Sequence, residues 1–239
     1  MPEQKVFVAS DESKAKAKQL RLFAILAWLI AIAGEIFAIF KLIHNNTLVW
    51  LIVAIVVILI LAVTGSMLWK KANRLDPASE KDKVKFFIQN QLGAIIGVLA
   101  FLPLVIAIFM NKDIDKKTKG IAGVIAVIAM LIAGITGIDF NPPSIEKYTR
   151  EINQQDSVLS KLTPGNNLVY LAKEGTVYHI YPDCQYIKNR DGVTQVTIKQ
   201  AFDQRGLSQL CKVCEKRAMK EKNLTPEETG NKNDTDNTQ

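Results

Sequence analysis

Four long apolar runs between residues 22 and 138 constrain the fold of this chain more than any other feature. A helix needs about 20 apolar residues to cross a bilayer, because each residue adds about 1.5 Å along the helix axis. A helix buried in a soluble domain rarely stays apolar on every face over such a length. The sequence therefore predicts an all-α membrane region of four transmembrane helices. We expect these helices at about residues 22–43, 48–68, 88–110 and 120–138.

The 21 residues before the first run are polar, and we interpret them as an N-terminal tail. Ser10, Asp11 and Glu12 are typical of a helix start, since small polar and acidic side chains stabilise the first helical turn. A cleaved signal peptide is the alternative. Its apolar core would be shorter than the first run, and the residues from His44 to Thr47 lack the small side chains of a cleavage site. We therefore expect a retained helix.

Basic residues are distributed unevenly along the chain, and they predict its orientation. Residues 1–138 hold 16 basic and 9 acidic side chains, whereas residues 139–239 hold 14 of each. Five basic residues precede the first span and six lie at 70–85, but none lies at 44–47. The positive-inside rule then places both termini in the cytoplasm. Four lysines at 111–119 oppose this assignment, because that loop would lie outside.

Small residues recur every four positions on the third and fourth spans, at Gly93 and Gly97 and at Ala129, Ala133 and Gly137. Such spacing lets helix backbones approach closely in lipid. We favour packing inside one chain over a dimer interface, and a homo-oligomer stays open.

Glu35 is the one charged residue well inside a span. A carboxylate in hydrocarbon is unfavourable, so it should face the bundle interior. It forms a proton or ion site, pairs with a polar group of another helix, or lies near the outer interface. Because no second charge lies deep in the other spans, we favour the structural role over transport.

The segment 142–163 is predicted to be a linker helix. It begins with two prolines, ends at Pro164-Gly165, and repeats apolar residues at near-helical spacing. A short coiled coil and a simple spacer both fit this pattern, since Gln155 interrupts the apolar seam.

A small α+β domain is predicted over residues 166–222. Segments 168–171 and 176–180 are expected to form a β-hairpin, followed by a third strand at 193–198. A helix over 199–205 should end at Gly206, and a last helix should begin near Cys211. Residues 223–239 are polar and are expected to form a disordered tail.

All three cysteines and one of the two histidines lie in this domain. His179 and Cys184 are separated by four residues, and Cys211 and Cys214 by two. One imidazole–thiolate pair and one pair of thiolates supply the four ligands of a closed tetrahedral zinc site. We therefore predict a structural zinc ion held by His179, Cys184, Cys211 and Cys214.

Two other interpretations of the cysteines fit the sequence less well. An odd number of cysteines at metal-ligand spacing argues against a disulfide framework. If His179 were an ordinary strand residue, Cys211 and Cys214 would remain as a redox pair. A thioredoxin-like site needs a βαβ context, which this sequence lacks.

The segment 167–218 resembles the Ada-type metal-binding domain. The resemblance rests on Tyr178-His179, on Cys184, on the run Ala201-Phe202-Asp203-Gln204-Arg205-Gly206-Leu207 and on the Cys211–Cys214 pair. In the Ada repair protein the first ligand is a cysteine that accepts a methyl group from DNA. His179 occupies that position here, so the resemblance implies the zinc fold but not the repair activity.

The membrane part resembles uncharacterised four-helix membrane proteins of Gram-positive bacteria, which implies a multi-pass protein of the bacterial plasma membrane. No serine–histidine, paired-carboxylate or phosphate-loop constellation is present, so we expect no enzyme. We expect an Ada-like interaction domain displayed in the cytoplasm for a protein partner. The alternatives are a membrane-tethered thiol or zinc stress sensor and a nucleic-acid-binding module. The latter would use Lys212, Lys216, Arg217 and Lys220.

Overall fold

The computed structural model describes residues 6–207 and 209–229. The chain divides into two compact units. One unit is Lys14–Pro143, and the other combines Met1–Ser13 with Ser144–Gln239. The first holds the apolar runs and the second holds the cysteines, so we call them the membrane unit and the C-terminal unit.

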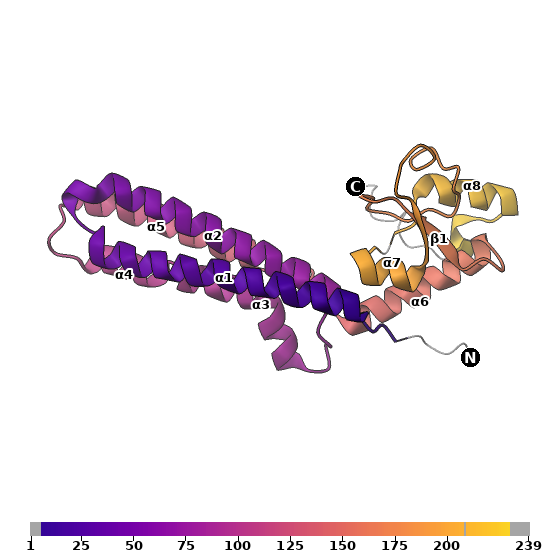
Figure 1. Ribbon diagram of the computed structural model, residues 1–239, viewed down its shortest axis with the longest axis horizontal. Helices are drawn as coiled ribbons and strands as arrows, with labels where there is room; N and C mark the ends of the chain where they lie inside the picture. Colours follow the sequence, from indigo (N-terminus) through magenta and orange to yellow (C-terminus); the bar gives the residue numbers. More distant parts are fainter. Residues whose placement is uncertain (1–5, 208, 230–239) are drawn as a thin grey trace. The chain divides into compact units, whose positions relative to one another are not determined.

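Long helices make up the membrane unit (Figure 1). They are α1 Asp11–Lys41, α2 Leu48–Leu75, α3 Lys83–Leu99, α4 Leu102–Met110 and α5 Lys116–Gly137, with a short 3-10 turn at Asn45–Thr47. In the described chain, four helical stretches are long and apolar enough to cross a membrane: α1, α2, α3 with α4, and α5. The four long apolar helices that the sequence predicted are therefore present in the structure.

The third span is interrupted, whereas the sequence predicted one continuous helix. Helix α3 ends at Leu99, and α4 begins at Leu102 with Pro103 in its first turn. Proline has no backbone N–H and its ring crowds the preceding turn, so it is tolerated at a helix start but not in a helix interior. The break therefore lies where the sequence places Pro103.

Helices α3 and α5 meet at the predicted small residues. A Cβ atom added to Gly97 would lie 2.7 Å from the carbonyl oxygen of Ala133. A Cβ atom added to Gly137 would lie 2.4 Å from the backbone nitrogen of Ala94. Only glycine permits this backbone approach, so the small-residue pattern serves packing within one chain.

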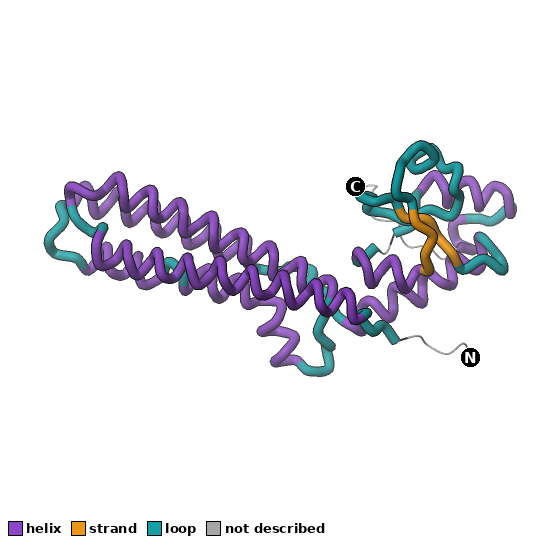
Figure 2. The backbone as a smooth tube through the Cα atoms, in the orientation of Figure 1, coloured by secondary structure: helices purple, strands orange, loops and turns teal. Residues whose placement is uncertain are grey.

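The C-terminal unit is a small α+β structure (Figure 2). Its elements are α6 Ile145–Leu162, β1 Leu168–Leu171, β2 Thr194–Thr197, α7 Ile198–Arg205, α8 Lys212–Lys222 and α9 Pro226–Thr229. Strands β1 and β2 pair antiparallel, with Val169 opposite Val196. Thr197 and Gln200 form a capping box at the start of α7, and Gly206 ends that helix with φ of 65°.

The predicted pairing of segments 168–171 and 176–180 is only partly correct. The full partner of β1 is β2, and the segment 176–180 meets β1 through one isolated bridge, between Tyr170 and His179. The neighbouring Tyr178 forms a second bridge, with Leu210. The segment pairs on two different sides because it must join β1 to the residues before Cys211, and this prevents a regular hairpin.

Helix α6 belongs to the core of the C-terminal unit. Tyr148, Ile152 and Leu159 of this helix are buried, and they pack in one cluster with residues of β1 and α7. Gln155, which interrupts the apolar seam, accepts a hydrogen bond from the hydroxyl of Tyr178. The apolar face of α6 is therefore covered by its own unit, not by a coiled-coil partner.

Residues just before α1 also pack in the C-terminal unit, although the sequence suggested a polar tail. Phe7 is buried against Tyr148. The backbone N–H of Ser10 donates to Oδ1 of Asp203 at 2.7 Å, and the hydroxyl of Ser13 donates to the Asp203 carbonyl at 2.9 Å. The segment from Phe7 to Ser13 therefore belongs to the C-terminal unit.

The polar C-terminal segment is ordered further than its composition predicted. The chain makes a helical turn at Pro226–Thr229, and Lys161 donates from Nζ to the carbonyl of Glu228 at 2.8 Å. The rest of the predicted disordered tail, residues 230–239, lies outside the described residues.

Candidate metal centre

His179 is held by the bridge to β1. Its backbone N–H donates to the carbonyl of Tyr170 at 2.9 Å, and its carbonyl accepts from the Tyr170 N–H at 2.7 Å. Two backbone hydrogen bonds on one residue fix the direction in which its side chain leaves the chain. The imidazole points towards the cysteines as a result.

Cys184 lies in a compact turn five residues later. Its backbone N–H donates to Tyr181, and its carbonyl accepts from the N–H groups of Ile187 and Lys188, both at 2.9 Å. The turn closes on itself, so the sulfur is presented by a rigid loop rather than by an extended segment.

Cys211 and Cys214 lie at the start of α8. The N–H of Cys211 donates to the carbonyl of Tyr178 at 2.9 Å, and the Tyr178 N–H donates to Gln209 at 3.0 Å. This pairing joins the α8 start to the residue before His179. The two halves of the predicted ligand set, 26 residues apart in sequence, are thereby brought together.

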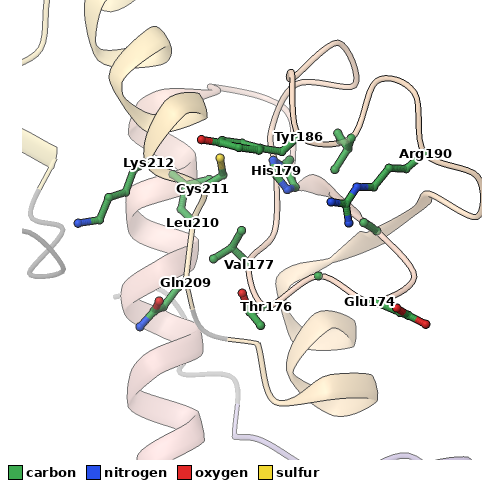
Figure 3. A pocket seen from close by; sticks show the side chains of 13 residues that line it. Glu174, Thr176, Val177, His179, Tyr186, Arg190, Gln209, Leu210, Cys211 and Lys212 are labelled. Carbon is green, nitrogen blue, oxygen red and sulfur yellow. The ribbon is translucent and has the colours of Figure 1, made fainter.

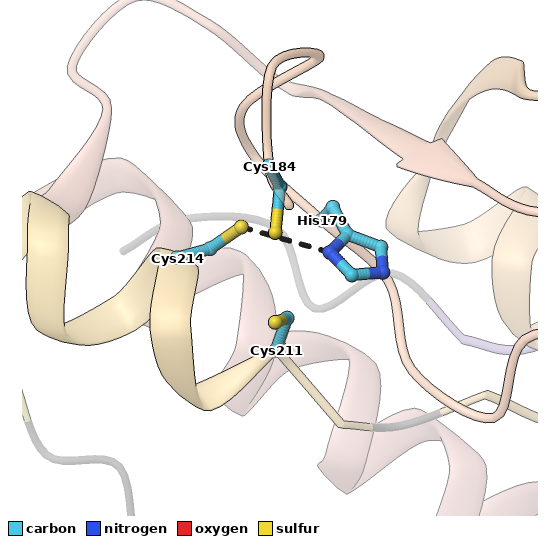
Figure 4. A group of neighbouring side chains, drawn as sticks. All are labelled: His179, Cys184, Cys211 and Cys214. Carbon is cyan, nitrogen blue, oxygen red and sulfur yellow. Dashed lines mark hydrogen bonds between the residues drawn. The ribbon is translucent and has the colours of Figure 1, made fainter. Parts of the chain in front are cut away.

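The four predicted ligands form one cluster (Figure 4). Their ligand atoms all lie within 4.8 Å of one another, and Nδ1 of His179 is 3.7 Å from Sγ of Cys214. Bond lengths of about 2.3 Å to sulfur and 2.0 Å to nitrogen in a tetrahedron imply edges of about 3.5 to 3.8 Å. All four residues are buried. The donor set and its spacing therefore fit a tetrahedral metal ion.

Burial sets the protonation preferences of these groups. Burial lowers the pKa of His179, and the positive charge of Arg190 lowers it further, which favours the neutral imidazole that binds metals. Burial raises the pKa of Cys214 to about 12, while the N–H groups of Ile180 and Tyr181 act in the opposite direction. A bound cation would supply the positive charge that a buried thiolate needs.

A ring of polar contacts around Arg217 links α8 to the Cys184 loop. The guanidinium donates to both carboxylate oxygens of Asp183, at 2.9 and 2.8 Å, and to Glu221 at 2.9 Å. It also lies 4.1 Å above the ring of Tyr181. Sequence reasoning missed this role and considered Arg217 only under the nucleic-acid-binding alternative. The spacing of Arg217 and Glu221, four residues apart on a helix, is the signal that predicts such a pair.

The fold and the cluster together fit a membrane protein with a metal site. Four helices can span the bilayer, and a separate unit holds one histidine and three cysteines at coordinating distances. No protein-family model, no curated protein and no solved structure matches the chain.

Proposed function

We propose that this chain is a multi-pass membrane protein that displays a structural-zinc domain in the cytoplasm as a non-enzymatic interaction module. The observation that carries the proposal is the convergence of four buried ligand atoms from two distant segments. An Ada-like zinc fold is the closest description of that domain that the sequence offers.

The ligand set supports a structural rather than a catalytic ion. Catalytic zinc keeps one coordination position open for water or substrate, whereas structural zinc is closed by four protein ligands. Three thiolates and one imidazole would fill all four positions of such a site here. A unit this small also buries limited apolar surface, so metal binding is expected to supply much of its folding free energy.

Two observations weigh against the alternative functions. The exposed fractions of Cys184, Cys211 and Cys214 are 4%, 4% and 1%, which restricts access by oxidants or alkylating agents. The guanidinium of Arg217 is paired with two carboxylates, so it is engaged within the protein rather than offered to phosphates. An interaction module therefore fits better than a thiol sensor or a nucleic-acid binder.

The cytoplasmic placement follows from charge. The segments expected to flank the membrane on that side carry most of the basic residues of the membrane unit. A reducing compartment also keeps thiolates available for a metal. The expected partners are the lipid bilayer and a protein that the C-terminal unit binds.

Metal analysis of the purified full chain tests the proposal. We expect one zinc per chain by mass spectrometry, and its loss in Cys211→Ser and Cys214→Ser. His44→Asn is the matched control, because His44 is the other histidine and lies in the loop after α1. Protein without stoichiometric zinc would refute the proposal, as would a Cys211→Ser variant whose C-terminal unit stays folded without metal.

A further inference from the structure

A pocket of about 650 Å³ lies directly beside the metal cluster (Figure 3). His179 and Cys211 belong to both the pocket and the cluster. Pockets of about 300 to 1,000 Å³ are the usual size for small-molecule sites. The pocket therefore has room for a small ligand that touches a metal-binding residue.

The imidazole of His179 presents different nitrogens to the two sites. Nδ1 faces the sulfur atoms, and Nε2 lies at the far side of the ring (Figure 4). A histidine that binds a metal through one nitrogen carries its proton on the other and donates it to an acceptor. Among the described residues none forms a hydrogen bond with Nε2, although the exposed fraction of His179 is only 3%.

Arg190 adds a second donor to the same pocket. Its guanidinium extends towards His179 in Figure 3, and its charge acts on that imidazole. Its side chain has no hydrogen-bonded acceptor in the described part of the chain. Glu174 also lines the pocket, but its carboxylate points away from His179. His179 and Arg190 therefore place two hydrogen-bond donors in this pocket.

The remaining walls combine apolar side chains with the polar side chains of Thr176, Gln209 and Lys212. Val177, Ile187 and Leu210 line the pocket, and Tyr186 lies beside Cys211 (Figure 3). The apolar side chains favour a ligand with an apolar body, while the donors of His179 and Arg190 favour a negatively charged group at one end.

We propose that this pocket binds a small organic anion, a carboxylate or a phosphate ester, whose charged group accepts hydrogen bonds from Nε2–H of His179 and from Arg190. The inference rests on the proposed metal site, because coordination through Nδ1 fixes the proton on Nε2. Ligand binding then changes the environment of a metal ligand, so occupancy of the pocket is reported at the metal.

Titration of the full chain in detergent tests this proposal. The protein is loaded with Co²⁺, whose visible absorption reports a tetrahedral thiolate site. Benzoate and phenyl phosphate distinguish the two anion types, and benzyl alcohol is the neutral control. We expect saturable shifts of the cobalt bands with one or both anions, and binding at least tenfold weaker with benzyl alcohol. Saturation-transfer NMR on the zinc-loaded chain measures the same affinities independently.

Arg190→Gln is expected to weaken anion binding at least tenfold. Lys188→Gln removes the same charge from an exposed residue outside the pocket lining and should leave binding unchanged. Equal binding of anions and benzyl alcohol would overturn the inference, as would wild-type affinity in Arg190→Gln. Absence of cobalt bands would refute the metal site and this inference with it. Cobalt bands that anions leave unchanged would refute this inference alone.

Discussion

Oε1 of Glu35 accepts a hydrogen bond from the backbone N–H of Leu104 at 3.1 Å, so a carboxylate of α1 caps the start of α4. The break before α4 leaves N–H groups without helical partners, and lipid offers none. The exposed fraction of Glu35 is only 3%. This contact gives Glu35 a structural role at the break between α3 and α4.

Removing that acceptor should destabilise the membrane unit. We expect Glu35→Ala to lower the free energy of unfolding by about 1 to 3 kcal/mol, the usual effect of leaving a buried donor unsatisfied. Glu35→Gln keeps a carbonyl oxygen and should retain most of the stability. Unfolding in mixed micelles, with an increasing fraction of denaturing detergent, measures the free energy of unfolding of both variants. Equal losses in the two variants would contradict the capping role.

The close approach of α3 to α5 predicts that two glycine-to-alanine substitutions differ in their effect on stability. Gly97→Ala places a methyl group against the carbonyl oxygen of Ala133, so overpacking should destabilise the unit by roughly 1 to 3 kcal/mol. A Cβ atom added to Gly120, which lies in α5, would meet no atom within 4 Å. Gly120→Ala should be neutral, or stabilising by up to about 1 kcal/mol through helix propensity. Thermal unfolding in detergent compares them, and similar behaviour would argue against close backbone packing.

Sequence periodicity predicts the local elements of this chain well. Apolar length identified the four spans, and the Gly93/Gly97 pattern identified the helix contact, because both depend on residues close in sequence. The ligand set was also predictable, since thiolate and imidazole spacing follows from coordination chemistry. The structure brings the four residues together.

Contacts between distant segments were not predictable from the same patterns. Segment 176–180 alternates like a strand, but its pairing is split between Tyr170 and Leu210. Phe7 lies in a polar stretch whose role depends on α6, more than a hundred residues later. The pairing of Arg217 with Asp183 likewise depends on how α8 meets the Cys184 loop. Local propensity carries no information on such pairings.

Glu151 of α6 predicts a pH dependence of the C-terminal unit. Burial raises its pKa above the ordinary 4.5, while Lys147 and Arg150 act against this shift. An acid with a raised pKa binds its proton more tightly in the folded state, so its contribution to stability falls as pH rises above 4.5. Glu151→Gln should therefore raise the unfolding midpoint relative to wild type at pH 7, and the difference should shrink at pH 4.

Glu221 provides a control of opposite sign. A hydrogen bond from Tyr181 and the ion pair with Arg217 lower its pKa, so its stabilising effect is present above pH 4.5 and is lost as pH falls. Glu221→Gln should lower the midpoint at pH 7 and approach wild type in acid. Wild type and the two variants carry the same metal ligands, so any effect of pH on the metal site is common to all three. Differences from wild type at each pH therefore report the two carboxylates alone. If the unfolding midpoints of both variants changed with pH in the same way relative to wild type, the opposite pKa shifts of Glu151 and Glu221 would be refuted.

Phe7 predicts that the C-terminal unit depends on the start of the chain. Its exposed fraction is 1%, and its ring packs edge-on against Tyr148 with centroids 5.1 Å apart. Its N–H donates to Oγ1 of Thr149 at 2.9 Å. We expect Phe7→Ala to destabilise this unit by roughly 3 to 5 kcal/mol, because the loss of a buried aromatic ring leaves a cavity. Hydrogen exchange in α6 and α7, measured in the full chain, should rise accordingly.

Val8→Ala is the matched control, because Val8 is adjacent and its exposed fraction is 58%. Exchange in this variant should stay within error of wild type, since surface truncations change stability little. Exchange in α2 and α5 should be unchanged in both variants, because Phe7 belongs to the C-terminal unit. If Phe7→Ala left α6 and α7 as protected as Val8→Ala does, the N-terminal segment would not be part of this core. A C-terminal fragment starting at Ser144 would then be expected to fold as well as the full chain.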